Sequence, residues 1–420
     1  MSFDVSRVRE EFPALSLTDN DKPRVYFDNP GGTQVPRAVI DRFRHCLIET
    51  NANLGGHFRT TVAMDAVMEE ARRAMADFLG AQSPEEIIFG QNMTSLTFHM
   101  SRCIASLLKP GDEIVVTQMD HDANISPWLL VARDRNCAVR WLPFDPETFE
   151  FDADSLGDIV GPRTRVVALN YASNVLGTIN DVATLIGRIR ALAPAAIVYV
   201  DAVQYAPHGL IDVRKLDCDM LVCSPYKFFG PHQGVLWGRR EVLDRLDSYK
   251  VRPAGDVLPY RFETGTLGHE GVAGILGTVE YFTWLGDTMG DPVPVEGDNA
   301  RRTSIKAAWR VLGEYETGLT RRLIDGLSAM PEVRILGISN PNAMYKRVPT
   351  VAITHKRLKP IEIARAFADR NVFVWNGHNF AVETARRLNL LETGGALRTG
   401  LAHYNTESEV DFALSILDDL

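Results

Sequence analysis

The sequence contains few cysteines and no long apolar segment. Five cysteines occur in 420 residues and none forms a Cys-x-x-Cys pair, so neither a disulfide framework nor a zinc site is expected. The longest apolar stretch, residues 191–200, contains Pro194 and is too short to span a bilayer. The first residues lack the basic-then-apolar pattern of a signal peptide. These absences predict a reduced, cytoplasmic protein without a membrane partner.

A run of basic residues is also absent. The chain has 45 Lys and Arg against 54 Asp and Glu, a net charge of −9, which argues against nucleic acid or an anionic membrane as the main partner. Hydrophobic residues make up 45% and charged residues 24% of the chain, as is typical of a soluble globular protein. The length predicts two or three domains.

Short β-branched runs alternate with helical patterns from about residue 25 to residue 240. Near-continuous apolar runs separated by helices predict an α/β fold with a mostly parallel sheet that is covered on both faces. The predicted strands are residues 86–89, 113–117, 137–142, 165–170, 196–200 and 220–223. A helix is predicted over residues 94–108, between the first two of them.

Beyond a linker at residues 291–298, the pattern predicts a smaller α+β unit. We therefore divide the chain into a large domain, residues 18–290, and a small domain, residues 291–420, which also takes the N-terminal helical segment 1–17. The elements predicted in the small domain are helices over 300–330, 361–369 and from 407, and strands near 334–336 and 351–354.

Polar side chains follow five of the predicted strands. In open α/β sheets a ligand binds beyond the carboxyl ends of the strands, so these side chains predict one site assembled along that edge. The clusters are Gln91-Asn92-Met93-Thr94-Ser95, Asp120-His121-Asp122, Ser173-Asn174, Asp201 with Gln204, and Ser224-Pro225-Tyr226-Lys227.

Two of these residues favour a pyridoxal phosphate site. The carboxylate of Asp201, at the end of an apolar strand, needs a cationic partner, which a protonated heteroaromatic nitrogen supplies. The amine of Lys227 lies among aromatic residues, so lost hydration should lower its pKa and raise its nucleophilicity. A lysine that forms an imine and an acid paired with a pyridinium nitrogen are the two marks of such a site. Taken alone, Lys227 would more often be a surface lysine and Asp201 a helix N-cap.

Three neighbouring features suit the same cofactor. His121 could stack on its ring, although it could equally cap a turn. Asn174 could donate a hydrogen bond to the phenolic oxygen. Residues 92–95 open a helix, so their backbone N–H groups and the Thr94 hydroxyl suit a phosphate.

The segments that carry these residues resemble those of the class V aminotransferases of pyridoxal-phosphate fold type I, and most closely the group II cysteine desulfurases. The resemblance extends over nearly the whole chain. It implies pyridoxal 5′-phosphate as the cofactor and a large domain with a mostly parallel seven-stranded sheet beside a smaller α+β C-terminal domain. The similar segments are MDHDANISPW (119–128), SNVLGT (173–178), VDAVQ (200–204), SPYKFFGP (224–231), FETGT (262–266) and LRTGLAHYNT (397–406).

The resemblance also implies roles for individual residues. Arg398 clamps the substrate carboxylate, a task that suits a bidentate guanidinium, and Thr266 reaches the phosphate of a neighbouring subunit, which implies a homodimer with shared sites. No metal is implied. Catalytic roles fall to Lys227, His121 and Asp201. These three residues also hold the cofactor, together with Asn174, Gln204, Ser224, Tyr226, Thr94, Met93 and Thr266. Further substrate contacts are assigned to Asn29, His57 and His378, although the two histidines are equally compatible with structural roles.

The sequence departs from the desulfurase pattern at several positions. Tyr226 stands where the family usually has histidine, and Met93 stands where it usually has threonine. Desulfurases carry a sulfur-accepting cysteine in an Arg-x-Gly-His-His-Cys motif, but residues 375–380 here read WNGHNF. Phe380 thus replaces the cysteine and Trp375 the arginine, and no cysteine follows Cys223.

Persulfide chemistry by that route is therefore excluded, because a phenyl ring cannot accept sulfur. The sequence favours a desulfurase-like enzyme that eliminates a β-substituent from an amino acid, as a C–S lyase does. A class V aminotransferase and an amino-acid epimerase are the alternatives, and a non-catalytic binding module is the alternative from another class. Phe380 and Trp375 suggest a substrate bulkier or more apolar than cysteine, provided that their loop lines the pocket.

Overall fold

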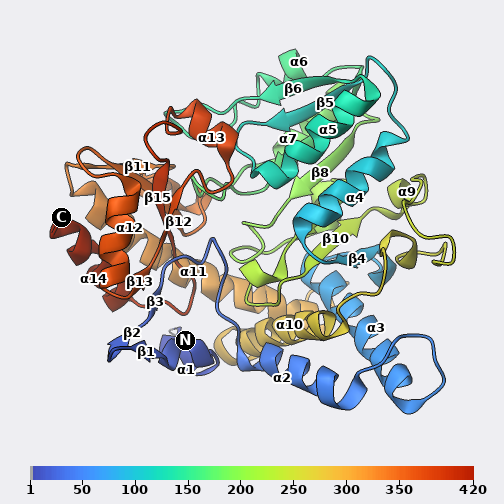
Figure 1. Ribbon diagram of the computed structural model, residues 1–420, viewed down its shortest axis with the longest axis horizontal. Coiled ribbons are helices and arrows are strands. Elements are labelled where there is room, and N and C mark those ends of the chain that lie inside the picture. The colour runs from blue at the N-terminus through green and yellow to red at the C-terminus, as the bar shows by residue number, and fades with distance from the viewer. Residues whose placement is uncertain (1–2) are drawn as a thin grey trace.

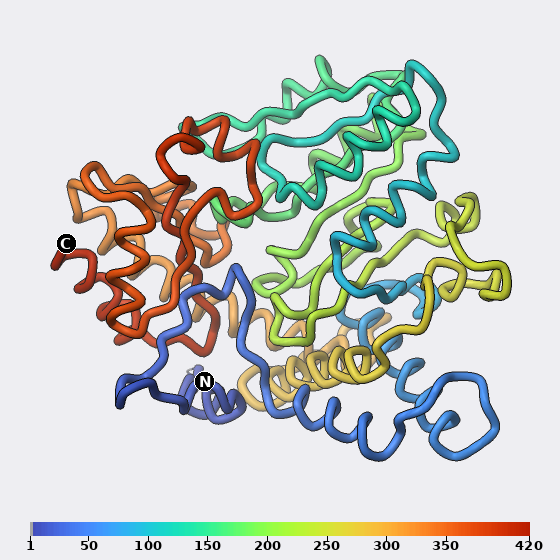
Figure 2. The backbone as a smooth tube through the Cα atoms, in the orientation of Figure 1, coloured from blue at the N-terminus to red at the C-terminus, as the bar shows by residue number. Residues whose placement is uncertain are grey.

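The computed structural model describes residues 3–420, and Figure 2 traces the path of its backbone. The structure contains a seven-stranded sheet and a four-stranded sheet, and Figure 1 shows the strands of the two sheets in different parts of the molecule. In the large sheet only β10 runs against its neighbours, so the predicted mostly parallel arrangement is confirmed. In spatial order the strands are β4 (Ile87–Gly90), β10 (Gly234–Gly238), β9 (Met220–Cys223), β8 (Ile197–Asp201), β7 (Thr164–Asn170), β5 (Glu113–Thr117) and β6 (Ala138–Leu142).

The large sheet is buried on both faces because alternate strand residues enter two different cores. In β8, Val198 and Val200 pack on one side, whereas Ile197 and Tyr199 pack on the other, as the two-residue period of a strand requires. One core is completed by α4 (Met93–Ala105) and α5 (Ser126–Arg135), and the other by α3 (Arg59–Leu79), α7 (Val182–Leu192) and α10 (His269–Met289). This burial on both faces explains why the central strands consist of nearly continuous apolar residues.

The small sheet is antiparallel, and Figure 1 shows it beside the carboxyl-terminal helices. Its order is β11 (Val333–Leu336), β12 (Thr350–His355), β15 (Ala396–Gly400) and β14 (Trp375–Gly377). Many apolar residues of this unit form one core, which also includes Val25 and Phe27 of the N-terminal segment. Leu336, Ala352 and Ala396 of the small sheet belong instead to a cluster shared with Met119 and Phe144. The helices that contribute to it are α11 (Ala300–Ser328), α12 (Pro360–Asp369) and α14 (Glu407–Asp418).

The N-terminal segment joins the two parts of the molecule. The strand β3 (Val25–Tyr26) pairs in parallel with β13 (Val372–Phe373), so a segment assigned from sequence to the large domain lies against the carboxyl-terminal part of the chain. The helix α1 (Val5–Glu10) also reaches both parts: Arg9 donates to the carbonyl of Tyr404 at 2.6 Å, and Phe12, just beyond the helix, packs on Phe229. Residues 1 and 2 of the predicted helical segment lie outside the described residues.

The predicted strands all exist, within one or two residues at their ends, but β10 and the two 21-residue helices α3 and α10 were not predicted. The helix α10 is difficult to recognise because it contains glycines, which are poor helix formers. A Cβ at Gly277 would lie 2.6 Å from the carbonyl oxygen of Ala38, and one at Gly286 would collide with the backbone of Ser304. Close packing against α2 (Arg37–His45) and α11 therefore requires glycine at both positions.

Across residues 3–420, no helix has both the length and the apolar character needed to cross a membrane. The same part of the chain holds no cluster of three or more His, Cys, Asp or Glu side chains that could bind a metal ion.

Candidate active site

A cavity of about 630 Å³ lies where the carboxyl ends of β7, β8 and β9 meet the small sheet. The predicted site thus assembles at the expected edge of the large sheet. Ten of the predicted site residues line this cavity: Met93, Thr94, His121, Asn174, Asp201, Gln204, Ser224, Tyr226, Lys227 and Arg398.

Lys227 lies in the short helical turn η5 (Pro225–Lys227), which follows β9. Its Nζ donates to the carbonyl oxygen of Pro30 and lies 4.9 Å from the centre of the Tyr226 ring. Burial and the nearby charge of Arg398 lower the pKa of Lys227 from 10.5 to about 7, although two carboxylates oppose the shift. Much of this amine is therefore neutral and nucleophilic near pH 7.

Asp201 ends β8 and is buried. Burial raises the pKa of its carboxyl group to about 6. Two effects act in the opposite direction and lower this pKa: a hydrogen bond of 2.9 Å from the Val203 N–H and the charge of Lys227. A cation placed against this carboxylate would favour its ionised form. The buried Asp120 is a second acid nearby, and burial raises its pKa well above the ordinary value.

His121 follows β5 and is neutral at physiological pH. Burial, together with the charges of Lys227 and Arg398, lowers the pKa of His121 to about 4. Its Nδ1 accepts from the backbone N–H of Ala123 at 3.0 Å, so the neutral ring carries its proton on Nε2. The ring is stacked on that of Phe380, with 5.5 Å between centroids and 21° between planes.

Arg398 lies on β15 and reaches the cavity from the small sheet. Its Nη2 is 3.0 Å from Oδ1 of Asp28, and its Nη1 donates to the carbonyl of Asn174 at 3.2 Å. Within the described chain, the buried Nε of Arg398 has no hydrogen-bond partner. Asp28 lines the cavity and was not predicted as a site residue. Its place in Tyr26-Phe27-Asp28, close to the start of the residues matched by the family model, is the sequence signal that could have indicated it.

Two amides in the cavity wall also keep one unpartnered atom each. Asn174 donates through Nδ2 to the carbonyl of Asn379 at 2.8 Å, and Gln204 donates through Nε2 to Oγ1 of Thr350 at 2.9 Å. The Oδ1 of Asn174 and the Oε1 of Gln204 are buried and have no partner among residues 3–420. Buried polar atoms are nearly always paired in native proteins, so these atoms indicate that a polar ligand belongs in the cavity.

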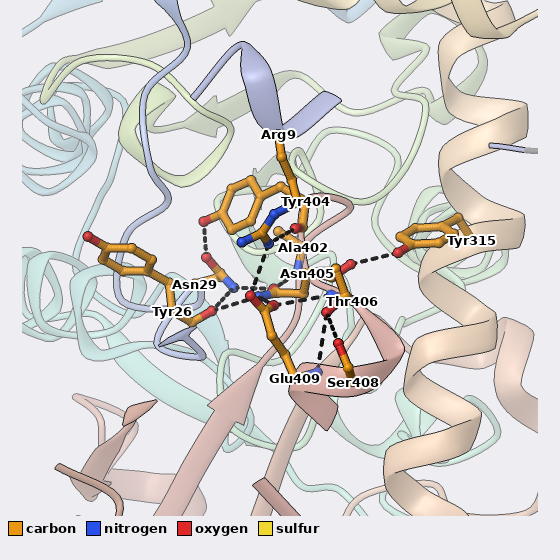
Figure 3. A network of polar contacts seen from close by, with 10 residues as sticks. All are labelled: Arg9, Tyr26, Asn29, Tyr315, Ala402, Tyr404, Asn405, Thr406, Ser408 and Glu409. Atoms are coloured by element: carbon orange, nitrogen blue, oxygen red, sulfur yellow. Dashed lines mark hydrogen bonds and ion pairs between the residues drawn. The ribbon is translucent and has the colours of Figure 1, made fainter. Parts of the chain in front are cut away.

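Four predicted site residues do not line the cavity. Asn29, predicted to contact the substrate, is buried and belongs instead to a polar network with Tyr404 and Asn405 (Figure 3). It donates to the carbonyl of Gly400 at 2.8 Å, so its amide joins the N-terminal segment to the small sheet. Both ends of this amide are therefore occupied by contacts within the chain, and the predicted contact of Asn29 with the substrate stays a prediction.

The other three residues are exposed. His57 lies in the loop before α3, Thr266 lies in the segment before α10, and the Nδ1 of His378 accepts from the backbone N–H of Phe380 at 3.1 Å. Their predicted roles stay predictions. Trp375 and Phe380 do line the cavity, together with Asp122 from one of the predicted polar clusters. Phe98 and Ser126 also line it and were not predicted to contact a ligand.

The cavity fits the cofactor that the resemblance implies. It places a nucleophilic amine, a buried acid and a neutral imidazole around one space, and these groups suit an aldehyde, a pyridinium nitrogen and a flat ring. The amino end of α4 also faces this space through Asn92, Met93 and Thr94, and a helix N-terminus is suited to bind a phosphate.

Comparisons with known proteins agree with this arrangement. The family model described as aminotransferase class-V matches residues 25–291 and 306–412. The chain is 31% identical to the aminotransferase-like protein FGM3 of Gibberella zeae, over 99% of this chain and 98% of the relative. It is 29% identical to a cysteine desulfurase of Serratia proteamaculans, over 98% and 97% of the two chains. The solved apo cysteine desulfurase of Thermococcus onnurineus matches with a TM-score of 0.85 and 25% identity, over 100% and 99% of the two chains.

These matches extend across both sheets and the segments that connect them. The mostly parallel seven-stranded sheet and the smaller carboxyl-terminal unit are the architecture of pyridoxal-phosphate fold type I. The chain therefore belongs to the class V aminotransferase family and is an enzyme that depends on pyridoxal 5′-phosphate.

Proposed function

We propose that this enzyme removes a β-substituent from an α-amino acid, as a C–S lyase does, without forming a persulfide. The observation that carries the proposal is that the buried amine of Lys227, whose pKa is lowered to about 7, and a guanidinium with an unpartnered Nε line the same cavity. A guanidinium suits the carboxylate of an amino acid, and a neutral amine suits removal of the α-proton.

The chain's own residues would hold the cofactor from three sides. Lys227 would bind it covalently, Asp201 would keep its ring nitrogen protonated, and His121 would stack on its ring. When bound, pyridoxal phosphate acts as an electron sink for charge that develops on the α-carbon. The remaining contacts would come from Met93, Thr94, Asn174, Gln204, Ser224 and Tyr226, all of which line the cavity.

The proton would move through Lys227. Its Nζ, once free of the cofactor, would take the α-proton, because a group with a pKa of about 7 is well matched to proton transfer near neutral pH. His121 would not act as a cationic acid at that pH, since the pKa of its ring is about 4. Arg398 would fix the carboxylate so that the α-carbon stays next to Nζ.

Elimination is preferred to persulfide formation because of the residues around the cavity. Phe380 supplies a phenyl ring at its wall, and no cysteine is among the described residues that line it. The bond from the β-carbon to its substituent would break, and the leaving group would depart with the electron pair. Hydrolysis of the remaining enamine by water would then give a 2-oxo acid and ammonia.

We also propose a homodimer in which Thr266 completes the partner's phosphate site. Thr266 is exposed and lies outside the cavity of its own chain. Exposed apolar residues occur near it in sequence, among them Val257 and Tyr260, and also on the segment from η2 (Cys46–Thr50) to α3. Large exposed apolar areas are typical of protein interfaces.

Two further proposals concern organisation and location. The division into domains 18–290 and 291–420 is supported by the core around the small sheet, in which all residues except Val25 and Phe27 come from 291–420. A cytoplasmic location is supported by the five cysteines, all of which are free, because disulfides are rare in the reducing cytosol.

The test is a product analysis on purified holoenzyme. Incubation with amino acids that carry a β-thioether should release a thiol, a 2-oxo acid and ammonia in equal amounts, and Lys227→Ala should abolish all three products. Transfer of the amino group to an added 2-oxo acid would instead identify an aminotransferase, and racemisation without release would identify an epimerase. Either outcome would reject the lyase proposal.

A further inference from the structure

We propose that Trp375, Asn379 and Phe380 form a recognition site for the substrate side chain, and that this site selects an aromatic side chain that carries a hydrogen-bond donor. The inference rests on the proposed function, because it takes the α-carboxylate to be bound by Arg398. All three residues line the cavity, and they come from β14 and the loop that follows it.

Trp375 lies next to the proposed carboxylate site by strand register. In the antiparallel pair β14 and β15, Trp375 is directly opposite Arg398. Residues that are directly opposite on neighbouring strands point to the same face, with Cβ atoms about 5 Å apart. An amino acid bound to Arg398 would therefore present its side chain within reach of the indole ring, which is 57% exposed.

Phe380 is held at the mouth of the cavity in a costly backbone conformation. Its φ is +57°, and φ of the preceding Asn379 is +52°, a region that bulky residues rarely occupy. Backbone hydrogen bonds maintain the conformation: the Asp122 N–H donates to the Phe380 carbonyl at 2.7 Å, and Asn174 donates to the Asn379 carbonyl at 2.8 Å. Phe380 is 66% exposed, and its ring is stacked on that of His121, so the loop presents the free part of this apolar ring to a ligand that enters the cavity.

Asn379 supplies the polar part of the site. The residue is 7% exposed, and its Nδ2 donates to the carbonyl of Gly377 at 3.0 Å. Its Oδ1 has no partner among the described residues, and an unpaired buried acceptor destabilises the site that contains it. A donor on the ligand would remove this cost.

The charge of Asp122, next to the loop that carries Asn379 and Phe380, also favours an aromatic side chain with a hydrogen-bond donor. Asp122 lines the cavity beside Phe380 and accepts from the Ser126 hydroxyl at 2.5 Å. A second carboxylate on the substrate would be repelled by Asp122, whereas an N–H or O–H group would not. The aromatic walls would pack against an aromatic ring, since such pairs are favourable beyond the area that they bury.

The experiment compares the binding of five amino acids to the holoenzyme. Calorimetric titrations would use L-tryptophan, L-tyrosine, L-phenylalanine, L-alanine and L-aspartate. The fluorescence difference between the wild type and Trp375→Phe would report contact with the indole ring independently of turnover. We expect the aromatic amino acids to bind about tenfold or more tightly than alanine, equivalent to about 1.4 kcal/mol, and to change the Trp375 signal.

Two variants separate the two parts of the site. Phe380→Gly suits a positive φ, and it should remove most of the difference in affinity between the aromatic amino acids and alanine. Asn379→Gly should remove the preference for tyrosine and tryptophan over phenylalanine. Tyr345→Ala is the matched control, because Tyr345 is an aromatic residue that is 75% exposed and does not line the cavity; it should leave every affinity unchanged.

The possible failures are distinguishable. If alanine or aspartate binds as tightly as the aromatic amino acids, or if Phe380→Gly keeps the aromatic preference, this inference is rejected and the proposed function stands. If no α-amino acid binds to the holoenzyme, both the proposed function and this inference are rejected.

Discussion

The guanidinium of Arg398 and the carboxylate of Asp28 form an ion pair of 3.0 Å at the wall of the cavity, although 370 positions separate the two residues. Asp28 thus binds Nη2 of the Arg398 guanidinium, which is the group that we propose to bind the substrate carboxylate. Its charge also raises the pKa of Lys227, against the larger effects of burial and of Arg398. Asp28 thus links the electrostatics of the proposed carboxylate site with those of the lysine.

Asp28→Asn should make Lys227 lose its proton at lower pH. The rising limb of kcat against pH, which reports a base that must be deprotonated in the bound complex, should therefore move to lower pH in this variant. Asp145→Asn is a suitable control, because Asp145 does not line the cavity. If the rising limb of kcat against pH does not move in Asp28→Asn, a group other than Lys227 determines the pH dependence of kcat.

The apoprotein should gain stability from Lys227 as pH rises above neutrality. The pKa of this lysine is about 7 in the folded chain and 10.5 when unperturbed, so the unfolded state binds more protons between these values and stability increases with pH. Below about pH 7 the amine is charged in both states, and the full cost of its burial is present. The melting temperature of the apo wild type, relative to that of apo Lys227→Ala, should therefore rise between pH 7 and pH 10. A difference in melting temperature that does not change with pH would contradict the lowered pKa.

The buried ion pair of Arg72 with Glu263 should be important for folding. Glu263 lies in the segment that leads to Thr266, and it accepts from Arg72 at 2.6 and 2.7 Å and from the Phe89 N–H at 2.8 Å. Arg72→Met would leave a buried carboxylate without its cation, which costs about 3–5 kcal/mol. The double variant Arg72→Met/Glu263→Gln should recover part of this loss, as measured by chemical denaturation; equal stability of the single variant and the wild type would contradict the assignment.

Mixing two inactive variants should test whether sites are shared. A Lys227→Ala subunit supplies an intact Thr266, and a Thr266→Val subunit supplies an intact Lys227. If Thr266 serves the partner's site, random dimers should restore tight cofactor binding at about a quarter of all sites, as measured by equilibrium dialysis. No recovery after confirmed subunit exchange would place Thr266 in the site of its own chain, or in neither site.

Much of the site could be predicted from the sequence because it depends on local order along the chain. Apolar runs such as residues 113–117 and 220–223 must become strands buried on both faces, and the residues after each strand then meet at one edge. His121, Asp201 and Lys227 were found in this way, and all three line the cavity.

The alternation of strands and helices, the residues after the strands and the aromatic pair at positions 375 and 380 all follow from the order of residues along the chain. The pairing of Asp28 with Arg398, the hydrogen bond from Asn174 to the Asn379 carbonyl and the pairing of β3 with β13 became known from the folded chain alone. The physical reason is that strand and helix patterns arise from interactions between near neighbours, whereas these contacts join segments 205 or more positions apart. Such contacts depend on which surfaces fit together after the elements have formed.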